Sequence, residues 1–143
     1  MANISANKTY LALDIGTQRI GVAIGQSSNR LPRPLTVLQN TDTIIEQINQ
    51  LIQLHKASGL VIGVPRGLDG QTTNQTRYTE DFIKSLTGRI VIPVYKQDEA
   101  VTSKQAEAEL VARGKPYSKA DIDALAATYI LDDFLQQPTI EAL

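Results

Sequence analysis

The fold is decided by the stretch Thr9-Tyr-Leu-Ala-Leu-Asp14-Ile-Gly16-Thr-Gln-Arg19-Ile-Gly21-Val-Ala-Ile24. Its two apolar runs, residues 10–13 and 20–24, predict buried strands, and Gly16 lies where the chain reverses between them. Asp14 closes the first run, and a carboxylate at the edge of a buried strand is costly unless a partner neutralises it. That partner is a cationic side chain, a cluster of backbone amides or a metal ion.

The rest of the chain predicts a mixed sheet with helices on its faces. A third strand follows closely enough to complete an antiparallel meander, and later strands alternate with helices, as parallel strands require. The expected strands are Pro34–Leu38, Leu60–Val64 and Ile90–Tyr95, and the expected helices are 43–57, 75–86, Thr102–Gly114 and Ser118–Leu135.

Local signals predict where the first and last helices begin and end. Thr43 and Glu46 have the spacing of a capping box, and Ser118 and Asp121 have the same spacing. Gly59 is expected to stop the first helix, since glycine is the common residue just beyond a helix C-terminus.

Size and composition predict one domain over residues 1–143, with 138–143 as a loose tail. The absence of cysteine excludes disulfides, thiolate zinc sites and a cysteine nucleophile. There is no signal-peptide pattern and no apolar run long enough to span a bilayer, so we expect a cytoplasmic protein with no membrane partner. The net charge of −1 argues against a protein that coats DNA indiscriminately, but it allows a local basic patch beside an acidic site.

Acidic residues at three places could converge at one end of such a sheet. Asp14 ends the first strand, and Asp98-Glu99 follows the strand expected at 90–95. Asp123 lies on the helical stripe Asp123, Ala127, Ile130, Phe134, which is otherwise small or apolar and should face the sheet. Asp121, by contrast, has a local role as the capping partner of Ser118.

Converging carboxylates repel one another, and a divalent cation removes that conflict. Oxygen-only ligands favour Mg²⁺ or Mn²⁺ over zinc, and such ions commonly take phosphate as a further ligand. The implied reaction is hydrolysis of a phosphodiester. The competing interpretation is structural: a solvated Asp98, a capping Asp121 and a hydrogen-bonded Asp14.

Motifs along nearly the whole chain resemble the YqgF family of Holliday-junction-resolvase-like or pre-16S rRNA nucleases. The opening motif is Leu13-Asp14-Ile-Gly16-Thr-Gln-Arg19-Ile-Gly21-Val-Ala. In order, the others are Val61-Ile-Gly63-Val-Pro65, Asp69-Gly70 with Gln75 and Phe82, Pro93-Val94, Asp98-Glu99 with Thr102-Ser103, and Ile122-Asp123-Ala-Leu-Ala-Ala127 through Ile130-Leu131.

The resemblance implies an α/β, ribonuclease H-like fold: a five-stranded mixed sheet, an antiparallel meander followed by parallel strands, flanked by helices. It implies that Asp14, Glu99 and Asp123 form the catalytic, metal-binding set for Mg²⁺ or Mn²⁺. The choice of Glu99 over Asp98 comes from the resemblance alone. The implied activity is that of a metal-dependent endonuclease that processes the 5′ end of pre-16S rRNA in ribosome biogenesis.

Several residues are candidates for binding nucleic acid. Arg19 lies in the turn beside Asp14 and suits either a phosphate or a carboxylate. The other candidates are Arg66, Lys96, Thr102, Ser103, Lys115 and Lys119. The family usually has an arginine where this chain has Ala100, and Arg66 or Lys96 could take over its role.

Three alternatives stay open at this stage. The substrate could be branched DNA, as for a Holliday junction resolvase, or the domain could bind nucleic acid without cutting it. Asp14-Ile-Gly16-Thr also resembles the phosphate loop of actin-like ATPases, although those proteins need two lobes and this chain has the length of one. We expect a monomer or a weak dimer.

Overall fold

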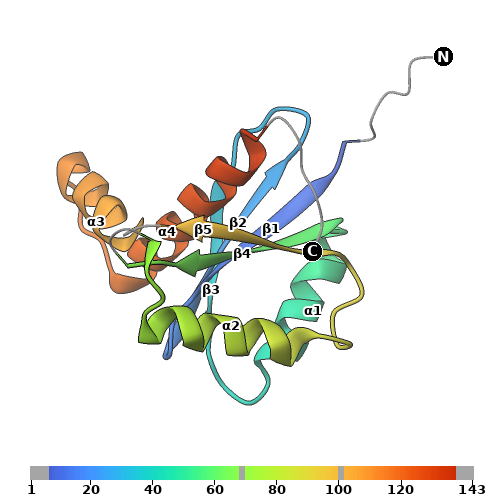
Figure 1. The fold of residues 1–143 in the computed structure, drawn as a ribbon. Helices are drawn as coiled ribbons and strands as arrows, with labels where there is room; N and C mark the ends of the chain where they lie inside the picture. Colours follow the sequence, from blue (N-terminus) through green and yellow to red (C-terminus); the bar gives the residue numbers. More distant parts are fainter. Residues whose placement is uncertain (1–6, 68–69, 100–101, 138–143) are drawn as a thin grey trace.

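The computed structural model of the chain describes residues 7–67, 70–99 and 102–137, with the side chains of 102–104 left undescribed. Five strands and four helices make up this part of the chain (Figure 1). The strands are β1 (Thr9–Ile15), β2 (Arg19–Gln26), β3 (Arg33–Gln39), β4 (Gly59–Pro65) and β5 (Val94–Glu99). The helices are α1 (Ile44–His55), α2 (Asn74–Leu86), α3 (Thr102–Arg113) and α4 (Lys119–Leu135).

The strands form one five-stranded sheet in the order β3-β2-β1-β4-β5. The β1–β2 and β2–β3 pairs are antiparallel, whereas β1–β4 and β4–β5 are parallel. The predicted mixed sheet, with its antiparallel meander followed by parallel strands, is therefore confirmed. The carboxyl ends of β1, β4 and β5 lie at the same edge of the sheet, because these three strands run in the same direction.

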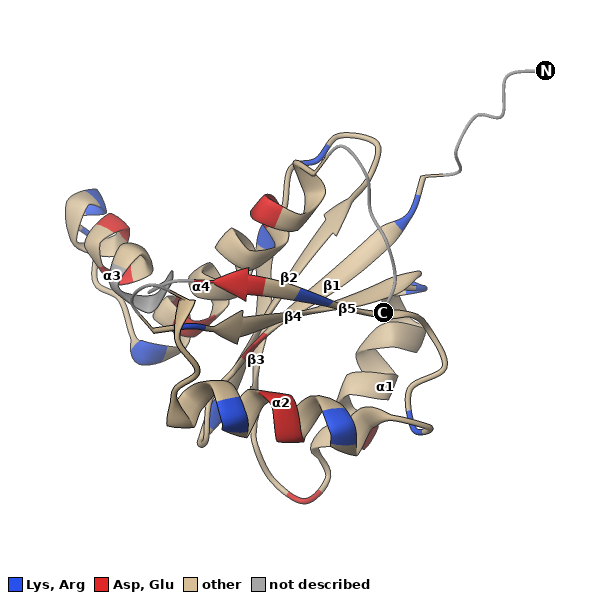
Figure 2. Cartoon of the chain, viewed as in Figure 1, with Lys and Arg blue, Asp and Glu red and all other residues tan. Residues whose placement is uncertain are grey.

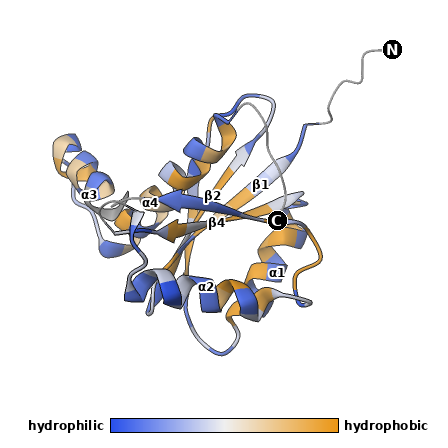
Figure 3. Cartoon of the chain, viewed as in Figure 1, coloured by the Kyte–Doolittle hydropathy of each residue, from blue (hydrophilic) through white to orange (hydrophobic). Residues whose placement is uncertain are grey.

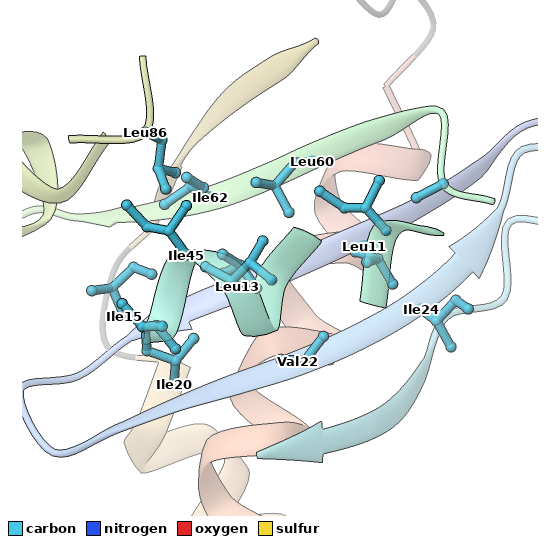
Figure 4. Close-up of a cluster of buried hydrophobic side chains, with 14 residues drawn as sticks. Leu11, Leu13, Ile15, Ile20, Val22, Ile24, Ile45, Leu60, Ile62 and Leu86 are labelled. Carbon is cyan, nitrogen blue, oxygen red and sulfur yellow. The ribbon is translucent and has the colours of Figure 1, made fainter. Parts of the chain in front are cut away.

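Successive side chains along each strand point to opposite faces of the sheet, and the two faces pack against different helices. Leu11, Leu13 and Ile15 of β1 pack into the larger hydrophobic cluster, which joins the sheet to α1 and α2 (Figure 4). Tyr10 and Ala12 point the other way, into a second cluster formed with α4. Asp14 lies two residues beyond Ala12 on β1, so its side chain is on the same face as Tyr10 and Ala12, the face covered by α4.

Helix α4 lies across the second face of the sheet, and α3 packs against α4 at a distance from the strands (Figure 1). Gly63 on β4 makes room for α4, because a Cβ there would lie 2.3 Å from the Cδ1 atom of Ile130. The predicted inward stripe of α4 is confirmed, since Ala127, Ile130 and Phe134 are buried. Helices α1 and α4 each carry both hydrophobic and hydrophilic residues, whereas the edge strand β5 is largely hydrophilic (Figure 3).

Two predicted element boundaries are wrong. The strand expected at 90–95 is β5, Val94–Glu99, because Ile90 and Ile92 pack against the core from the preceding connection and are not part of a strand. The helix expected at 43–57 is α1, which ends at His55, and Lys56 takes the left-handed conformation (φ 52°) expected of a glycine. Gly59 is instead the first residue of β4.

The two predicted capping boxes had different outcomes. Thr43 makes no side-chain capping hydrogen bond to α1, so that prediction is wrong. Ser118 and Asp121 form both reciprocal bonds at the start of α4, as predicted.

The tail predicted at 138–143 lies outside the described residues. None of the helices within 7–67, 70–99 and 102–137 is both long and apolar enough to cross a membrane.

Candidate active site

A cleft of about 400 Å³ opens at the edge of the sheet where β1, β4 and β5 end. Asp14, Glu99 and Asp123, which come from β1, β5 and α4, all line it. Arg19 and Gln75 line it as well, together with the turn that joins β1 to β2. The three carboxylates predicted from the sequence therefore share one cleft, although they are far apart in the chain.

Gly21 brings Asp123 close to Asp14. Gly21 is the register partner of Asp14 in the β1–β2 ladder, so the two residues share a face of the sheet. A Cβ on Gly21 would lie 2.0 Å from the carbonyl oxygen of Asp123, so the first turns of α4 rest directly on this glycine. Burial, and then the charge of Asp123, raises the pKa of Asp14 to about 6.

The alternation of β5 directs Glu99, and not Asp98, toward the cleft. Tyr95, on the same face as Glu99, packs against Tyr10 and Phe134 beneath α4. Asp98 belongs to the opposite face, where it accepts a hydrogen bond from Arg66. Figure 2 shows these two acidic residues at the tip of β5.

The surroundings of Glu99 disfavour the ionised form of its carboxyl group. Its pKa is raised to about 9, first by burial and then by a hydrogen bond and charge repulsion from Asp133, with Asp98 and Asp14 adding to the repulsion. Its Oε1 atom is buried and has no hydrogen-bond partner among the residues that the structure describes. Asp133 was missed by the sequence argument, because nothing in the local pattern of α4 links this exposed residue to the end of β5.

The residues that the structure describes include no set of three acidic or histidine side chains close enough together to hold a metal ion. Asp123 is paired with Arg19, since its Oδ2 atom accepts a hydrogen bond from Nε of Arg19 at 2.6 Å. The three carboxylates line one cleft, and their binding of a metal ion stays a prediction. The donors still suit Mg²⁺ or Mn²⁺. All are oxygens, one buried oxygen finds no hydrogen-bond partner in the described part of the chain, and burial, followed by repulsion from neighbouring carboxylates, raises the pKa of Asp14 and of Glu99.

Side chains from two other elements hold the turn between β1 and β2. Gln75 on α2 donates to the carbonyl of Ile15 at 2.9 Å, and Asn40 donates to the carbonyl of Gly16 at 2.8 Å. Gly16 in turn donates its amide to the carbonyl of Arg19 at 3.0 Å. Asn40 was missed by the sequence argument, because it lies in an ordinary polar turn before α1.

Of the predicted nucleic-acid-binding residues whose side chains the structure describes, Arg19 alone lines this cleft. Arg66 and Lys96 line a separate hollow along α2, where they pair with Asp98 at 3.3 Å and with Glu80 at 3.0 Å. Lys115 and Lys119 are exposed beside the start of α4. The side chains of Thr102 and Ser103 lie outside the described part of the chain.

Comparisons with known proteins agree with this architecture. The family model described as "RuvX: Holliday junction resolvase" matches residues 8–137. A relative from Sulfurihydrogenibium sp. (strain YO3AOP1), named "Putative pre-16S rRNA nuclease", is 39% identical over 129 residues, 89% of each chain. One with the same name from Thiobacillus denitrificans is 38% identical over 138 residues, 94% of this chain and 95% of its own.

A solved structure shares the fold at low sequence identity. It is described as "T. thermophilus RuvC in complex with Holliday junction substrate" and superposes with a TM-score of 0.55 at 16% identity. The alignment covers 94% of this chain and 99% of the other. This likeness agrees with the ribonuclease H-like architecture implied by the motifs.

Proposed function

Because this chain belongs to the RuvX family, we propose that it is a metal-dependent endonuclease that hydrolyses phosphodiester bonds in structured nucleic acid. The substrate we propose is the 5′ end of the small-subunit ribosomal RNA precursor, in keeping with the names of the relatives that match along most of their length. The observation that carries the proposal is the convergence of Asp14, Glu99 and Asp123 on one open cleft.

In this proposal Asp14 and Asp123 hold a divalent cation, Mg²⁺ or Mn²⁺, and Glu99 completes its ligands. A cation bound there supplies Lewis-acid activation of water and neutralises charge on the phosphodiester. Asp14 suits this role because it lies on a central strand whose position is fixed by hydrogen bonding on both sides. Asp123 suits it because the contact with Gly21 leaves its backbone little freedom.

Glu99 must release a proton before it can act as a ligand. Its raised pKa means that the carboxyl group is largely protonated at neutral pH in the absence of a cation. Cation binding would favour the ionised form, because a carboxylate must be deprotonated to act as a ligand. The protein therefore takes up the cation more tightly as the pH rises.

The test is cleavage by the purified chain with Mn²⁺. We expect it to cut a pre-16S 5′ leader RNA, and Asp14→Asn to lose at least about a hundredfold in rate, as when an essential catalytic group is removed. Asp42→Asn is the matched control, since Asp42 is exposed in the turn before α1 and does not line the cleft. Cleavage by Asp14→Asn at the wild-type rate would show that the acidic residues are not the catalytic machinery.

The same assay distinguishes the proposed function from two alternative functions. The family description favours a four-way DNA junction as substrate, so the junction is tested beside the RNA under identical conditions. The ion pair between Arg19 and Asp123 favours a domain that binds nucleic acid without cutting it. Binding of either substrate without cleavage, in Mg²⁺ and in Mn²⁺, would support that second function.

A further inference from the structure

The guanidinium of Arg19 lies between a cleft carboxylate and open solvent. Its Nε atom donates to Oδ2 of Asp123 at 2.6 Å, and the side chains are 33% and 20% exposed, respectively. Within residues 7–67, 70–99 and 102–137, its two terminal nitrogens donate no hydrogen bond. An arginine that pairs through Nε alone keeps both terminal nitrogens available for a second, bidentate partner.

The contact also leaves half of the Asp123 carboxylate available. Only Oδ2 accepts from Arg19, and no described residue donates to Oδ1. Asp123 can therefore offer Oδ1 to a cation while Oδ2 stays paired. A carboxylate held at one oxygen is also restricted in rotation, which orients the other oxygen.

The base of the Arg19 side chain is rigid. Arg19 opens β2, pairs in register with Gln39 of β3, and accepts the amide of Gly16 at its carbonyl. Asn40 and Gln75 hold the same turn from two other elements. The guanidinium is thus presented at the cleft from a backbone fixed on three sides.

We propose that Arg19 is a positioning residue that bridges Asp123 and a phosphate of the bound nucleic acid at the same time. Nε fixes Asp123, and the two terminal nitrogens grip a non-bridging phosphate oxygen pair next to the bond to be cut. This inference rests on the proposed nuclease function. In this arrangement a single conformation of the Arg19 side chain binds the carboxylate and the phosphate at the same time.

The test compares Arg19→Gln and Arg19→Lys with wild type. Affinity for a labelled RNA hairpin and for a four-way DNA junction is measured by fluorescence anisotropy in EDTA, where no cleavage occurs, over a range of salt concentrations. Thermal unfolding is recorded on the same samples. Arg89→Gln is the matched control, because Arg89 is exposed in the turn before β5, at the other end of the sheet.

We expect Arg19→Gln to lose about tenfold in affinity and to lower the salt-dependence slope by about one, the effect of one lost phosphate contact. Arg19→Lys should keep the thermal stability of wild type, because a lysine can still pair with Asp123, but it should not regain the affinity. Lysine is a point charge and cannot hold two partners through a planar fork. Arg89→Gln should change neither the slope nor the affinity by as much as twofold.

Two results would overturn the bridge. If Arg19→Gln binds with wild-type affinity and slope, Arg19 serves only to neutralise Asp123. If Arg19→Lys restores full affinity, a single positive charge suffices and the fork has no role. Failure of the wild-type chain to bind either nucleic acid, in EDTA and again with Ca²⁺ in its place, would instead overturn the proposed function, and the bridge with it.

Discussion

Gly21 and Asp123 are in backbone contact: a Cβ on Gly21 would lie 2.0 Å from the carbonyl oxygen of Asp123 and 2.3 Å from its carbonyl carbon. No flexible side chain intervenes that could move aside. Because Gly21 is also the register partner of Asp14, this one contact places a helix-borne carboxylate beside a strand-borne one. Because Gly21 has no side chain, the start of α4 can approach the sheet closely enough to place Asp123 beside Asp14.

Replacing Gly21 with alanine should push α4 away from the sheet. We expect Gly21→Ala to lower the free energy of unfolding by about 3 kcal/mol, at the upper end of overpacking costs, and to abolish cleavage. Urea denaturation followed by circular dichroism measures the first effect. Gly25→Ala, on the same face of β2, should cost less, because two of its three nearest atoms belong to the flexible side chains of Leu131 and Leu135. Equal losses in the two variants would contradict this account.

Glu99 should make the metal-free protein less stable as the pH rises. Its folded-state pKa of about 9 lies above the ordinary glutamate value of 4.5, so the folded protein holds a proton that the unfolded chain has released between these values. The stability linked to Glu99 is therefore complete below about pH 4.5 and is lost progressively up to about pH 9. In EDTA, we expect Glu99→Gln to have a higher Tm than wild type at pH 8 and a nearly equal Tm at pH 4.5.

Differential scanning fluorimetry at matched ionic strength measures this pH dependence. Glu46→Gln on the outer side of α1 is the control, and its difference from wild type should not vary in the same way. A Glu99→Gln variant that unfolds below the wild-type temperature at pH 8 would mean that the ionised carboxylate has a stabilising partner.

Divalent cations should stabilise the protein, and more strongly at higher pH. Mn²⁺ at a hundred times its Kd should add about 2.7 kcal/mol to the free energy of unfolding. At one fixed Mn²⁺ concentration the gain should be smaller at pH 5 than at pH 8, because Asp14, with its pKa raised to about 6, must be ionised to bind a cation. Isothermal titration calorimetry with MnCl₂ at the two pH values measures the affinity directly. Asp14→Asn should remove the response; a response retained in that variant would place the cation elsewhere.

Asn40 should stabilise the turn that carries Gly16 and Arg19. Its side-chain amide donates to the carbonyl of Gly16 at 2.8 Å and to the hydroxyl of Tyr78 at 3.0 Å. We expect Asn40→Ala to cost about 1 kcal/mol of stability and to speed amide exchange in the turn, since the carbonyl loses its donor. Hydrogen exchange followed by mass spectrometry reports on residues 15–19. Tyr78→Phe removes only the second of these bonds, so it should leave exchange in the turn unchanged.

Much of this fold could be predicted from local pattern alone. Apolar runs bounded by glycine and proline located four of the five strands, and the capping box at Ser118 located the start of α4. Helical spacing also placed Asp123 on the buried side of α4, which is where it lies. These predictions depend only on residue type and on the spacing of apolar residues, and both can be read from a short segment of the chain.

The errors arise where tertiary contact overrides local pattern. Ile90 and Ile92 have the character of strand residues, but they fill the core from a connection, so β5 begins later than expected. Arg66 and Lys96 were predicted to contact phosphate; each pairs with an acidic residue, and their binding of nucleic acid stays a prediction. Metal binding at the three carboxylates, the single-domain organisation and the oligomeric state stay predictions.

The sequence by itself determined the class of fold, the order of its elements and the positions of the candidate acidic residues, Asp14, Asp98-Glu99 and Asp123, because periodicity and turn residues are local properties. Only the tertiary structure decided that Glu99 and not Asp98 lies on the cleft, since that depends on how β5 pairs with β4. It alone joined Arg19 to Asp123 and seated α4 on Gly21. Such contacts depend on strand register and on how closely a helix can approach a sheet, and those quantities exist only once the chain is packed.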